Sequence, residues 1–288
     1  MNALEINNLT KDLKGFSLKN IDFELPKGYI LGYIGQNGAG KTTTIKLIMN
    51  QLKRNSGEIK VFGKEYEDDE AGYKDMIGFI GDESYFPTCF TLKDVISTLK
   101  DFYNSFDEVK FKEYADKWSL PYNKKIKEFS KGMKAKLDFA SVLSRDTKLL
   151  LLDEPTSGLD PVVRSEVLEI LQEYISNGER SVIFSTHIMS DLEKITDYLY
   201  FINNGEKVFY DTTENVLENH LVVKGGTEDL KEEVKEKLIG YKTSHMGFEG
   251  LIYSKDKEYL DEENLLFEKP SMDDIVVFYI NGTKEGKK

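Results

Sequence analysis

The sequence predicts a mixed α/β fold in which helices cover both faces of a parallel sheet. The first observation is an apolar run at residues 29–34, which ends in a glycine-rich turn and leads into a segment with helical spacing of apolar residues. The second is a pair of apolar runs, 149–152 and 181–185, separated by another helical segment. Runs that are apolar on both faces are typical of buried parallel strands, and their alternation with helices is typical of doubly wound sheets.

Further strands and a helical insertion are indicated around this core. Alternating apolar positions at 4–9 and 18–25 predict two antiparallel strands, and residues 76–80 predict another strand. Residues 83–147 have a helical pattern. We therefore expect them to form a helical subdomain inserted into the α/β core.

Polar residues mark the ends of two expected helices. Thr91 and Asp94 form the pattern of a capping box in front of the first. Asp160 is placed to cap the second, at 161–177, which has a proline in its first turn and Gly178 just beyond its end.

The pattern changes after about residue 211. From there the chain alternates short strands with charged or short helical segments, which predicts a separate small α+β unit. The expected division is therefore 1–215 and 216–288. The segments that predict the second unit are 222–223, 229–238, 250–254 and a helix from Ser271.

Composition restricts the classes of partner. The 288-residue chain has 39 basic and 51 acidic residues, a formal net charge of −12, which argues against a nucleic-acid partner because phosphate backbones are bound by clustered lysine and arginine. A single cysteine, Cys89, excludes an internal disulfide and fits a reducing compartment. The start has no signal-peptide pattern, and no apolar run approaches the ~20 residues that span a bilayer. We expect a soluble, intracellular protein that reaches a membrane only through another chain.

The glycine-rich turn matches the P-loop pattern G-x-x-x-x-G-K-[ST]. Its glycines let consecutive N–H groups point at phosphate oxygens, Lys41 adds a cation at the β- and γ-phosphates, and the Thr42 hydroxyl is a ligand for Mg²⁺. The strand before it and the helix after it favour nucleotide binding over a chance glycine turn. The nucleotide-binding residues predicted here are Gly35, Gln36, Asn37, Gly38, Ala39, Gly40, Lys41, Thr42 and Thr43.

Two acidic residues follow the apolar run at 149–152. Asp153 at the end of that strand is placed to reach Mg²⁺, and Glu154 is placed to orient or polarise an attacking water. An acidic pair after a strand is by itself most often a cap or a surface feature. The P-loop upstream favours the metal role for Asp153 and the catalytic role for Glu154.

Three motifs stand along the chain: NGAGKTT at 37–43, DEPTSGLD at 153–160 and STH at 185–187. In this order they resemble the ATP-binding subunit of an ABC transporter. The resemblance covers about residues 1–215, and it implies a RecA-like P-loop NTPase core with an antiparallel β subdomain and the helical subdomain at about 83–147. Within the family the chain is most similar to compact subunits of Gram-positive bacteria that work with a separately encoded permease, some of which carry an accessory C-terminal tail.

Residues 129–133, FSKGM, stand where family members have the signature LSGGQ. The resemblance implies that Ser130 and Gly132 contact the γ-phosphate of ATP bound to a second subunit, so that ATP lies between two cassettes. Lys131 replaces the first glycine, and Met133 replaces the glutamine. An ordinary helix cap at Ser130 is the alternative.

Two more positions match family motifs. Asp160 matches the D-loop aspartate, which crosses the dimer interface, and His187 matches the switch histidine, which contacts the γ-phosphate and the region of Glu154. The resemblance therefore implies that Lys41, Glu154 and His187 carry ATP hydrolysis.

Two positions depart from the family pattern. Asp82 stands near the place of the Q-loop glutamine, where a carboxylate can replace the amide as a Mg²⁺ ligand; a solvated acidic loop is the alternative. Leu13 occupies the place of the aromatic residue that stacks on adenine. Phe16 is the nearest ring, and we expect it to substitute.

The resemblance also implies a membrane partner. Tyr85, Phe86, Pro87 and Phe90 fall where the family has the groove for a coupling helix of the permease, although a buried aromatic cluster is the alternative. We expect an ATPase at the cytoplasmic face of the membrane, in a homodimer or heterodimer with a second cassette. The alternative function is a soluble ABC-type ATPase that acts on ribosomes or DNA without a permease. Cargo and transport direction depend on the permease, and resistance to a peptide antibiotic is one form such transport takes.

Overall fold

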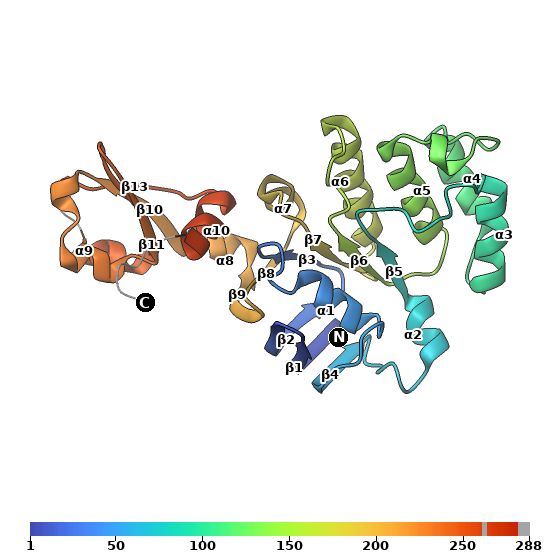
Figure 1. Cartoon of the computed structure of the whole chain (residues 1–288), viewed down its shortest axis with the longest axis horizontal. Helices are drawn as coiled ribbons and strands as arrows, with labels where there is room; N and C mark the ends of the chain where they lie inside the picture. The colour runs from blue at the N-terminus through green and yellow to red at the C-terminus, as the bar shows by residue number, and fades with distance from the viewer. Residues whose placement is uncertain (261–263, 282–288) are drawn as a thin grey trace. The chain divides into compact units, whose positions relative to one another are not determined.

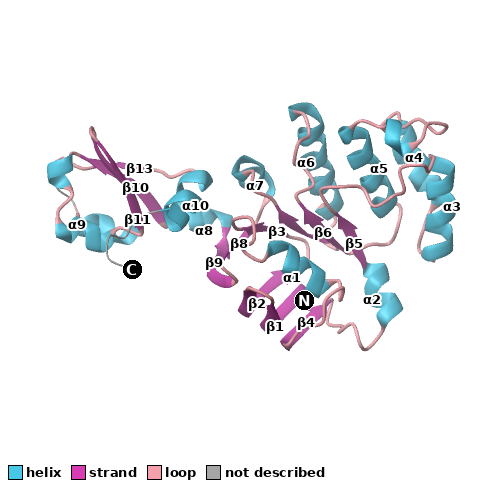
Figure 2. Ribbon diagram, in the orientation of Figure 1, coloured by secondary structure: helices cyan, strands magenta, loops and turns pink. Residues whose placement is uncertain are grey.

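The computed structural model describes residues 1–260 and 264–281. The chain divides into two compact units: Met1–His187 with Tyr200–Tyr210, and Ile188–Leu199 with the described residues from Asp211 onward. Figure 1 shows the elements in chain order and Figure 2 their type. The division near Asp211 lies close to the expected boundary, but residues 188–199, which that boundary assigns to the first domain, belong to the second unit.

A three-stranded antiparallel sheet opens the first unit, in the order β2-β1-β4. The strands predicted at 4–9 and 18–25 are confirmed and are longer than predicted, and β4 is a third strand that the sequence analysis missed. Ile6 in the central strand pairs with Phe23 on one side and Ile59 on the other, so alternate side chains enter the core. The bounds are β1 Asn2–Leu13, β2 Phe16–Pro26 and β4 Ser56–Val61.

The main sheet has six strands in the order β5-β6-β7-β3-β8-β9. Strands β5, β6, β7 and β3 are parallel, which confirms the predicted parallel core, and their carboxyl ends therefore meet at one edge. Four consecutive leucines of β6 are fully buried because the strand has neighbours on both sides and helices on both faces. The bounds are β3 Ile30–Ile34, β5 Ile77–Ile80, β6 Leu149–Asp153, β7 Ser181–Ser185, β8 Tyr198–Asn203 and β9 Glu206–Thr212.

Helices cover this sheet from two sides. In Figure 1, α6 lies above the parallel strands and α1 lies below them. Helix α1 ends at Ile48, and Asn50 just after it has a left-handed conformation. Asp160 caps α6 as predicted, accepting hydrogen bonds from the N–H groups of Val162 and Val163 at 3.1 Å. The bounds are α1 Lys41–Ile48, α2 Glu70–Met76 and α6 Pro161–Ile175.

The predicted helical insertion between β5 and β6 is confirmed. Its apolar faces pack into one core that includes Leu92, Phe111 and Leu137, each fully buried. The carboxylate of Asp94 accepts hydrogen bonds from the N–H and hydroxyl of Thr91, which fixes the start of α3. The helices are α3 Leu92–Phe102, α4 Glu108–Lys117 and α5 Lys131–Leu143, with a 3-10 turn at Ile126–Glu128.

The second unit contains an antiparallel sheet in the order β11-β12-β10-β13. The predicted strands around 222–223 and 250–254 are its two central strands, and the predicted helix at 229–238 begins later because residues 227–229 form a 3-10 turn. Its core includes Val223, Phe248 and Ile252. The elements are α7 Met189–Ile195, α8 Thr213–Glu218, β10 His220–Gly225, α9 Glu232–Lys237, β11 Gly240–Ser244, β12 Gly247–Tyr253, β13 Leu266–Glu268 and α10 Met272–Asn281.

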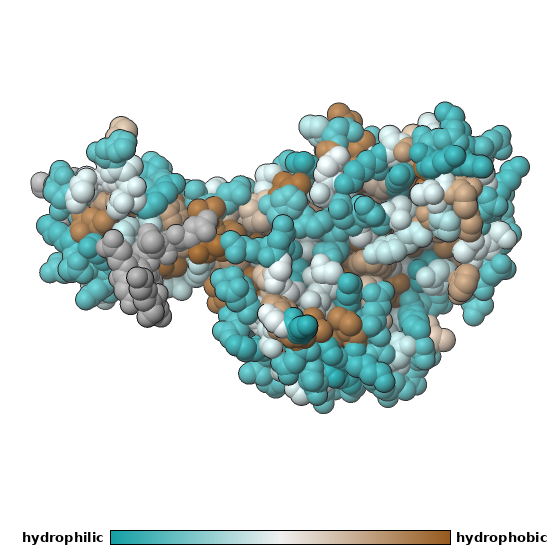
Figure 3. All heavy atoms as spheres, viewed as in Figure 1, coloured by the Kyte–Doolittle hydropathy of each residue, from teal (hydrophilic) through white to brown (hydrophobic). Residues whose placement is uncertain are grey.

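Within residues 1–260 and 264–281, no helix has both the length and the apolar character needed to cross a membrane. Hydrophilic residues dominate the face seen in Figure 3, and apolar residues form small areas between them.

Candidate active site

The loop between β3 and α1 has a backbone that only glycine allows. Gly40 has φ = +121°, and a Cβ added there would lie 2.6 Å from the Leu18 side chain. A Cβ on Gly35 would lie 2.5 Å from the carbonyl oxygen of Ile202. The loop therefore brings its backbone close to its neighbours and leaves the N–H groups at the start of α1 available for a ligand.

Lys41 is a buried cation at the start of α1, with an exposed fraction of 6%. Its Nζ donates a hydrogen bond to the carbonyl oxygen of Gly35 at 2.6 Å, and a second carbonyl oxygen, that of Gln36, lies 3.4 Å away. Burial lowers the pKa of Lys41, while the carboxylates of Glu154 and Asp153 act in the opposite direction. The ammonium is thus held under the loop, next to two carboxylates.

Thr42 and Asp153 contact each other directly, although they are 111 residues apart. The Thr42 hydroxyl donates a hydrogen bond to Oδ2 of Asp153 at 2.7 Å. This follows from the fold, because β6 delivers Asp153 to the same sheet edge from which α1 starts. A hydroxyl and a carboxylate oxygen side by side are the hard oxygen donors that Mg²⁺ prefers, so the residues present fit the predicted metal site.

Glu154 and His187 form the second pair at this edge. His187 Nδ1 lies 2.7 Å from Oε2 of Glu154, and the His187 N–H donates to the same oxygen at 3.3 Å. The register of β6 and β7 places Asp153 beside Ser185, which brings the two following segments together. Glu154 has φ = +58°, a strained conformation for a residue other than glycine, and such strain is common at functional sites.

Three other predicted residues lie at the starts of α5 and α6. Ser130 caps α5 by accepting a hydrogen bond from the Met133 N–H at 3.2 Å, as the capping alternative predicted, and Asp160 caps α6. A Cβ on Gly132 would lie 3.2 Å from the side chain of Val163, so the two helix starts pack against each other. The capping roles are compatible with an outward-facing surface, because Ser130 and Asp160 are exposed.

The two departures from the family pattern have defined surroundings. Phe16 lies against the P-loop, because its ring tip is 3.1 Å from the position that a Cβ on Gly40 would take. Leu13 pairs with Phe16 across the hairpin and is exposed. Asp82 forms an ion pair with Lys131 at 2.9 Å, so the structure places it with a cation that the sequence analysis did not connect to it.

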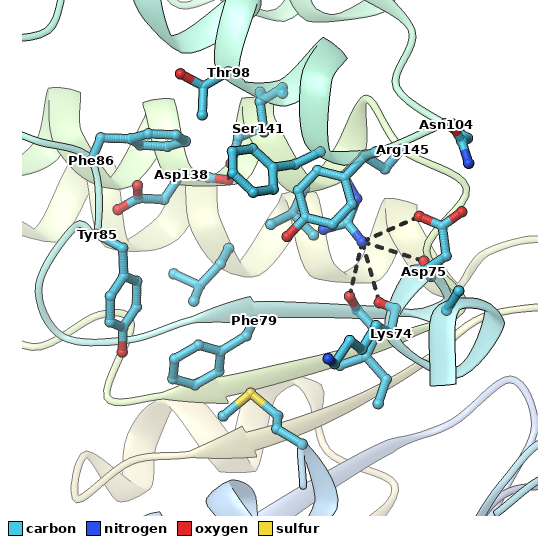
Figure 4. A pocket seen from close by; sticks show the side chains of 18 of the residues that line it. Lys74, Asp75, Phe79, Tyr85, Phe86, Thr98, Asn104, Asp138, Ser141 and Arg145 are labelled. Atoms are coloured by element: carbon cyan, nitrogen blue, oxygen red, sulfur yellow. Dashed lines mark hydrogen bonds and ion pairs between the residues drawn. The ribbon is translucent and has the colours of Figure 1, made fainter. Parts of the chain in front are cut away.

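A large open groove lies on the first unit beside the predicted aromatic segment. Its volume is about 1240 Å³, and Figure 4 shows the side chains that line it. Tyr85 is 71% exposed, whereas Phe86 and Phe90 are partly buried and pack against the helical core. Phe86 and Phe90 thus agree with the buried-cluster alternative. Tyr85, which is exposed but lies beside the Phe79 ring with 5.4 Å between ring centroids, stays a predicted interface residue.

Arg145, which the sequence analysis missed, forms one wall of the groove. Its guanidinium donates to the carbonyl oxygens of Lys74, Asp75 and Ile77 at 3.3–3.4 Å and stacks on the Tyr103 ring, 3.4 Å from its centroid (Figure 4). These contacts tie the turn after α5 to α2 and to the start of β5. The wall is rigid because a planar guanidinium with several acceptors has little freedom to move.

Asp138 is a buried carboxylate in the same groove. It accepts a hydrogen bond from the Ser84 hydroxyl at 2.7 Å, and among the described residues no lysine or arginine forms an ion pair with it. Burial raises the pKa of Asp138 to about 7. No sequence signal pointed to it, because Lys134 and Ser141 stand one turn before and one turn after Asp138 on α5, as on a solvated helix face.

Replacing Asp138 by asparagine should stabilise the protein above pH 7. The folded-state pKa of about 7 lies above the ordinary value of 3.8, so the folded protein binds a proton that the unfolded chain releases. The contribution of this group to stability is therefore fully present below about pH 4 and is lost as the pH rises to about 7. We expect Asp138→Asn to raise the free energy of unfolding at pH 8 by about 1–3 kcal/mol and to flatten its decline between pH 4 and 7.

Urea unfolding at several pH values measures this effect. Asp146→Asn is the matched control, because Asp146 is the exposed aspartate just beyond α5. If the free energy of unfolding of Asp138→Asn depends on pH in the same way as that of the parent, Asp138 is ionised in the folded protein.

Comparisons with known proteins agree with these features. A family model described as ABC transporter matches residues 18–157. The lantibiotic transport ATP-binding protein SrtF of Streptococcus pyogenes is 34% identical over 226 residues, which is 75% of this chain and 94% of SrtF. The ABC transporter ATP-binding protein YtrB of Bacillus subtilis is 30% identical over 202 residues, 70% of this chain and 69% of YtrB.

A solved structure described as the ATP-binding subunit of an ABC transporter has the same fold. It matches with a TM-score of 0.68 and 25% identity, over 74% of this chain and 91% of that one. The predicted P-loop NTPase architecture is thereby confirmed. With the P-loop, the Thr42–Asp153 contact and the Glu154–His187 pair in place, the chain belongs to the ABC transporter family as an ATP-binding protein that hydrolyses ATP.

Proposed function

We propose that this chain is the ATP-hydrolysing subunit of a transporter whose membrane permease is a separate protein. The observation that carries the proposal is the convergence of Lys41, Thr42, Asp153, Glu154 and His187 at one edge of the main sheet, in a unit that also carries an open groove. The first feature supports phosphate chemistry. The second offers a surface through which that chemistry can act on a partner.

Each residue of the cluster has a role that its contacts support. The P-loop N–H groups and Lys41 bind the β- and γ-phosphates, and Phe16, packed against the loop, is placed to contact the adenine. Thr42 and Asp153 would hold Mg²⁺, and the ion would supply neutralisation of the phosphate charge. Asp82 stays a predicted ligand of the ion, and in this structure its carboxylate is paired with Lys131.

Glu154 is the residue we assign to the attacking water. Its carboxylate is oriented by two hydrogen-bonding contacts to His187, one from the ring and one from the backbone. The side chain of His187 is 60% exposed, which leaves its other ring nitrogen free to contact the γ-phosphate. The strained backbone at Glu154 supports a fixed direction for the carboxylate.

Two cassettes are proposed to enclose each ATP. The P-loop of one subunit binds the nucleotide, while Ser130 and Gly132 of the other subunit contact its γ-phosphate and Asp160 contributes to the interface. The second cassette is a copy of this chain or a relative. Exposure of Ser130 and Asp160 supports the proposal, because a buried pair could not reach another molecule.

The groove of about 1240 Å³ is proposed to receive a cytoplasmic segment of the permease. An exposed aromatic ring, Tyr85, beside partly buried aromatic residues is typical of interface anchors. Docking there would hold the chain at the cytoplasmic face of the membrane.

Purification from membranes of the source cell tests this proposal. We expect affinity-tagged chain to recover a protein with several apolar helices, and Tyr85→Ala to recover several-fold less of it. Tyr259→Ala is the matched control, since Tyr259 is 75% exposed and lies on the second unit. Recovery of ribosomes in place of a permease would support the alternative, a soluble ABC-type ATPase.

A further inference from the structure

The ion pair between Asp82 and Lys131 joins two of the positions at which this chain departs from the family pattern. Nζ of Lys131 lies 2.9 Å from Oδ1 of Asp82, and the two residues are 49 positions apart in the sequence. Their side chains are 48% and 53% exposed. Asp82 and Lys131, each of which departs from the family pattern, are therefore each other's ion-pair partner.

Lys131 lies on the surface proposed to face the second subunit. It is the first residue of α5, between Ser130 and Gly132. Its Nζ lies 3.1 Å from the position that a Cβ on Gly158 would take, so the side chain lies against the loop between β6 and α6. The ammonium is therefore carried by the same short segment that is proposed to reach the γ-phosphate of the second subunit's ATP.

The Asp82–Lys131 ion pair is weak enough for Lys131 to exchange Asp82 for a phosphate group. An exposed ion pair changes an equilibrium by a factor of about five or less, because water screens both charges. A lysine in the first turn of a helix is also opposed by the partial positive charge of the helix end, and the first turn of α5 contains no acidic residue. A triphosphate has several negative charges and forms strong charge-assisted hydrogen bonds, so it competes well with one carboxylate.

We propose that Lys131 is a phosphate-binding residue that acts across the dimer, and that Asp82 is a positioning residue that holds it within its own subunit. This inference rests on the proposed ATP-bound dimer. When the second subunit presents its ATP to Ser130 and Gly132, the ammonium of Lys131 leaves Asp82 and binds the γ-phosphate. The exchange breaks one ion pair and forms another, with no covalent change.

Dimerisation of the full chain in the Glu154→Gln background measures the role of Lys131, because slow hydrolysis keeps ATP intact. Sedimentation is followed while Mg²⁺ and ATP are titrated. We expect Lys131→Met to raise the ATP concentration for half-dimerisation by about tenfold or more, since a charge-assisted contact is lost. Lys131→Arg keeps the charge and should stay close to the parent. Lys127→Met is the matched control, as Lys127 is an exposed lysine just before the segment.

A second set of variants tests the role of Asp82. Asp82→Asn frees Lys131 and should lower the ATP concentration for half-dimerisation by about two- to fivefold. The double variant Asp82→Asn, Lys131→Met should behave like Lys131→Met alone, because the gain requires the lysine. With ADP, which has no γ-phosphate, Lys131→Met and its parent should not differ. Thermal unfolding of each variant verifies that it is folded.

The outcomes separate this inference from the proposed function. If Lys131→Met dimerises at the same ATP concentration as its parent, Lys131 does not bind the phosphate, and the dimer itself stands. If the Glu154→Gln parent does not dimerise with ATP, the proposed ATP-bound dimer is wrong. Asp82→Asn can also be compared in the parent and in Lys131→Met. If it weakens dimerisation equally in both, Asp82 acts on its own, as a metal ligand, and its positioning role is wrong.

Discussion

Replacing Glu154 by glutamine should lower the rate of ATP hydrolysis by about 10²- to 10⁴-fold, while ATP still binds and holds two cassettes together. The amide cannot accept a proton or polarise water as the carboxylate does. It keeps the size and the acceptor oxygen, so the hydrogen bond from the His187 N–H can persist. Phosphate release at saturating ATP measures turnover, and sedimentation in the same buffer measures the dimer.

Glu169→Gln is the matched control for this experiment. Glu169 is an exposed carboxylate on α6, and its removal should leave the rate unchanged. Unchanged turnover in Glu154→Gln would remove Glu154 from the mechanism. The attacking water would then have to be oriented by another group at the same sheet edge.

Replacing Lys41 by methionine should weaken ATP binding by about 10- to 100-fold and slow hydrolysis by at least about 10²-fold. The ammonium contacts the loop carbonyl of Gly35 and is held beside Asp153 and Glu154, so its loss removes the buried cation nearest the proposed phosphate site. Methionine keeps the length and apolar volume of the side chain, and burying it carries no desolvation penalty for a charge. We therefore expect a folded protein.

Binding of a fluorescent ATP analogue measures the affinity, and phosphate release measures the rate. Lys46→Met is the matched control, because Lys46 lies on the same helix but is exposed. If Lys41→Met bound ATP as tightly as the parent, the P-loop backbone alone would account for phosphate affinity.

The sequence predicted the strands of the parallel core well. Strands β3, β6 and β7 are apolar on both faces because they are buried on both faces, and this pattern is visible without the structure. Strands β4, β8, β9, β11 and β13 were missed. Four of them, β4, β9, β11 and β13, lie at a sheet edge, where only one side of the strand is paired. Strand β8 lies between β3 and β9 and is mostly buried, so burial alone did not make it recognisable. The sequence predicts a role for the first unit but not for the second, because the second unit contains no contiguous motif that we recognise.

The sequence by itself determined the P-loop and the pair Asp153 and Glu154. Such motifs are contiguous, and their chemistry depends on backbone geometry within a few residues, so the sequence contains nearly all the information that positions them. His187 was indicated by the resemblance to the family, through the residues STH at 185–187 at the end of a buried strand.

Only the tertiary structure decided the contacts between distant segments. The Asp82–Lys131 pair and the buried carboxylate of Asp138 depend on how the helical insertion packs beside β5, and exposed or isolated charges leave no periodic pattern in a sequence. The same packing forms the groove beside Tyr85. Local chemistry was readable from the order of residues, whereas the partners of single charges were set by packing between segments far apart in the chain.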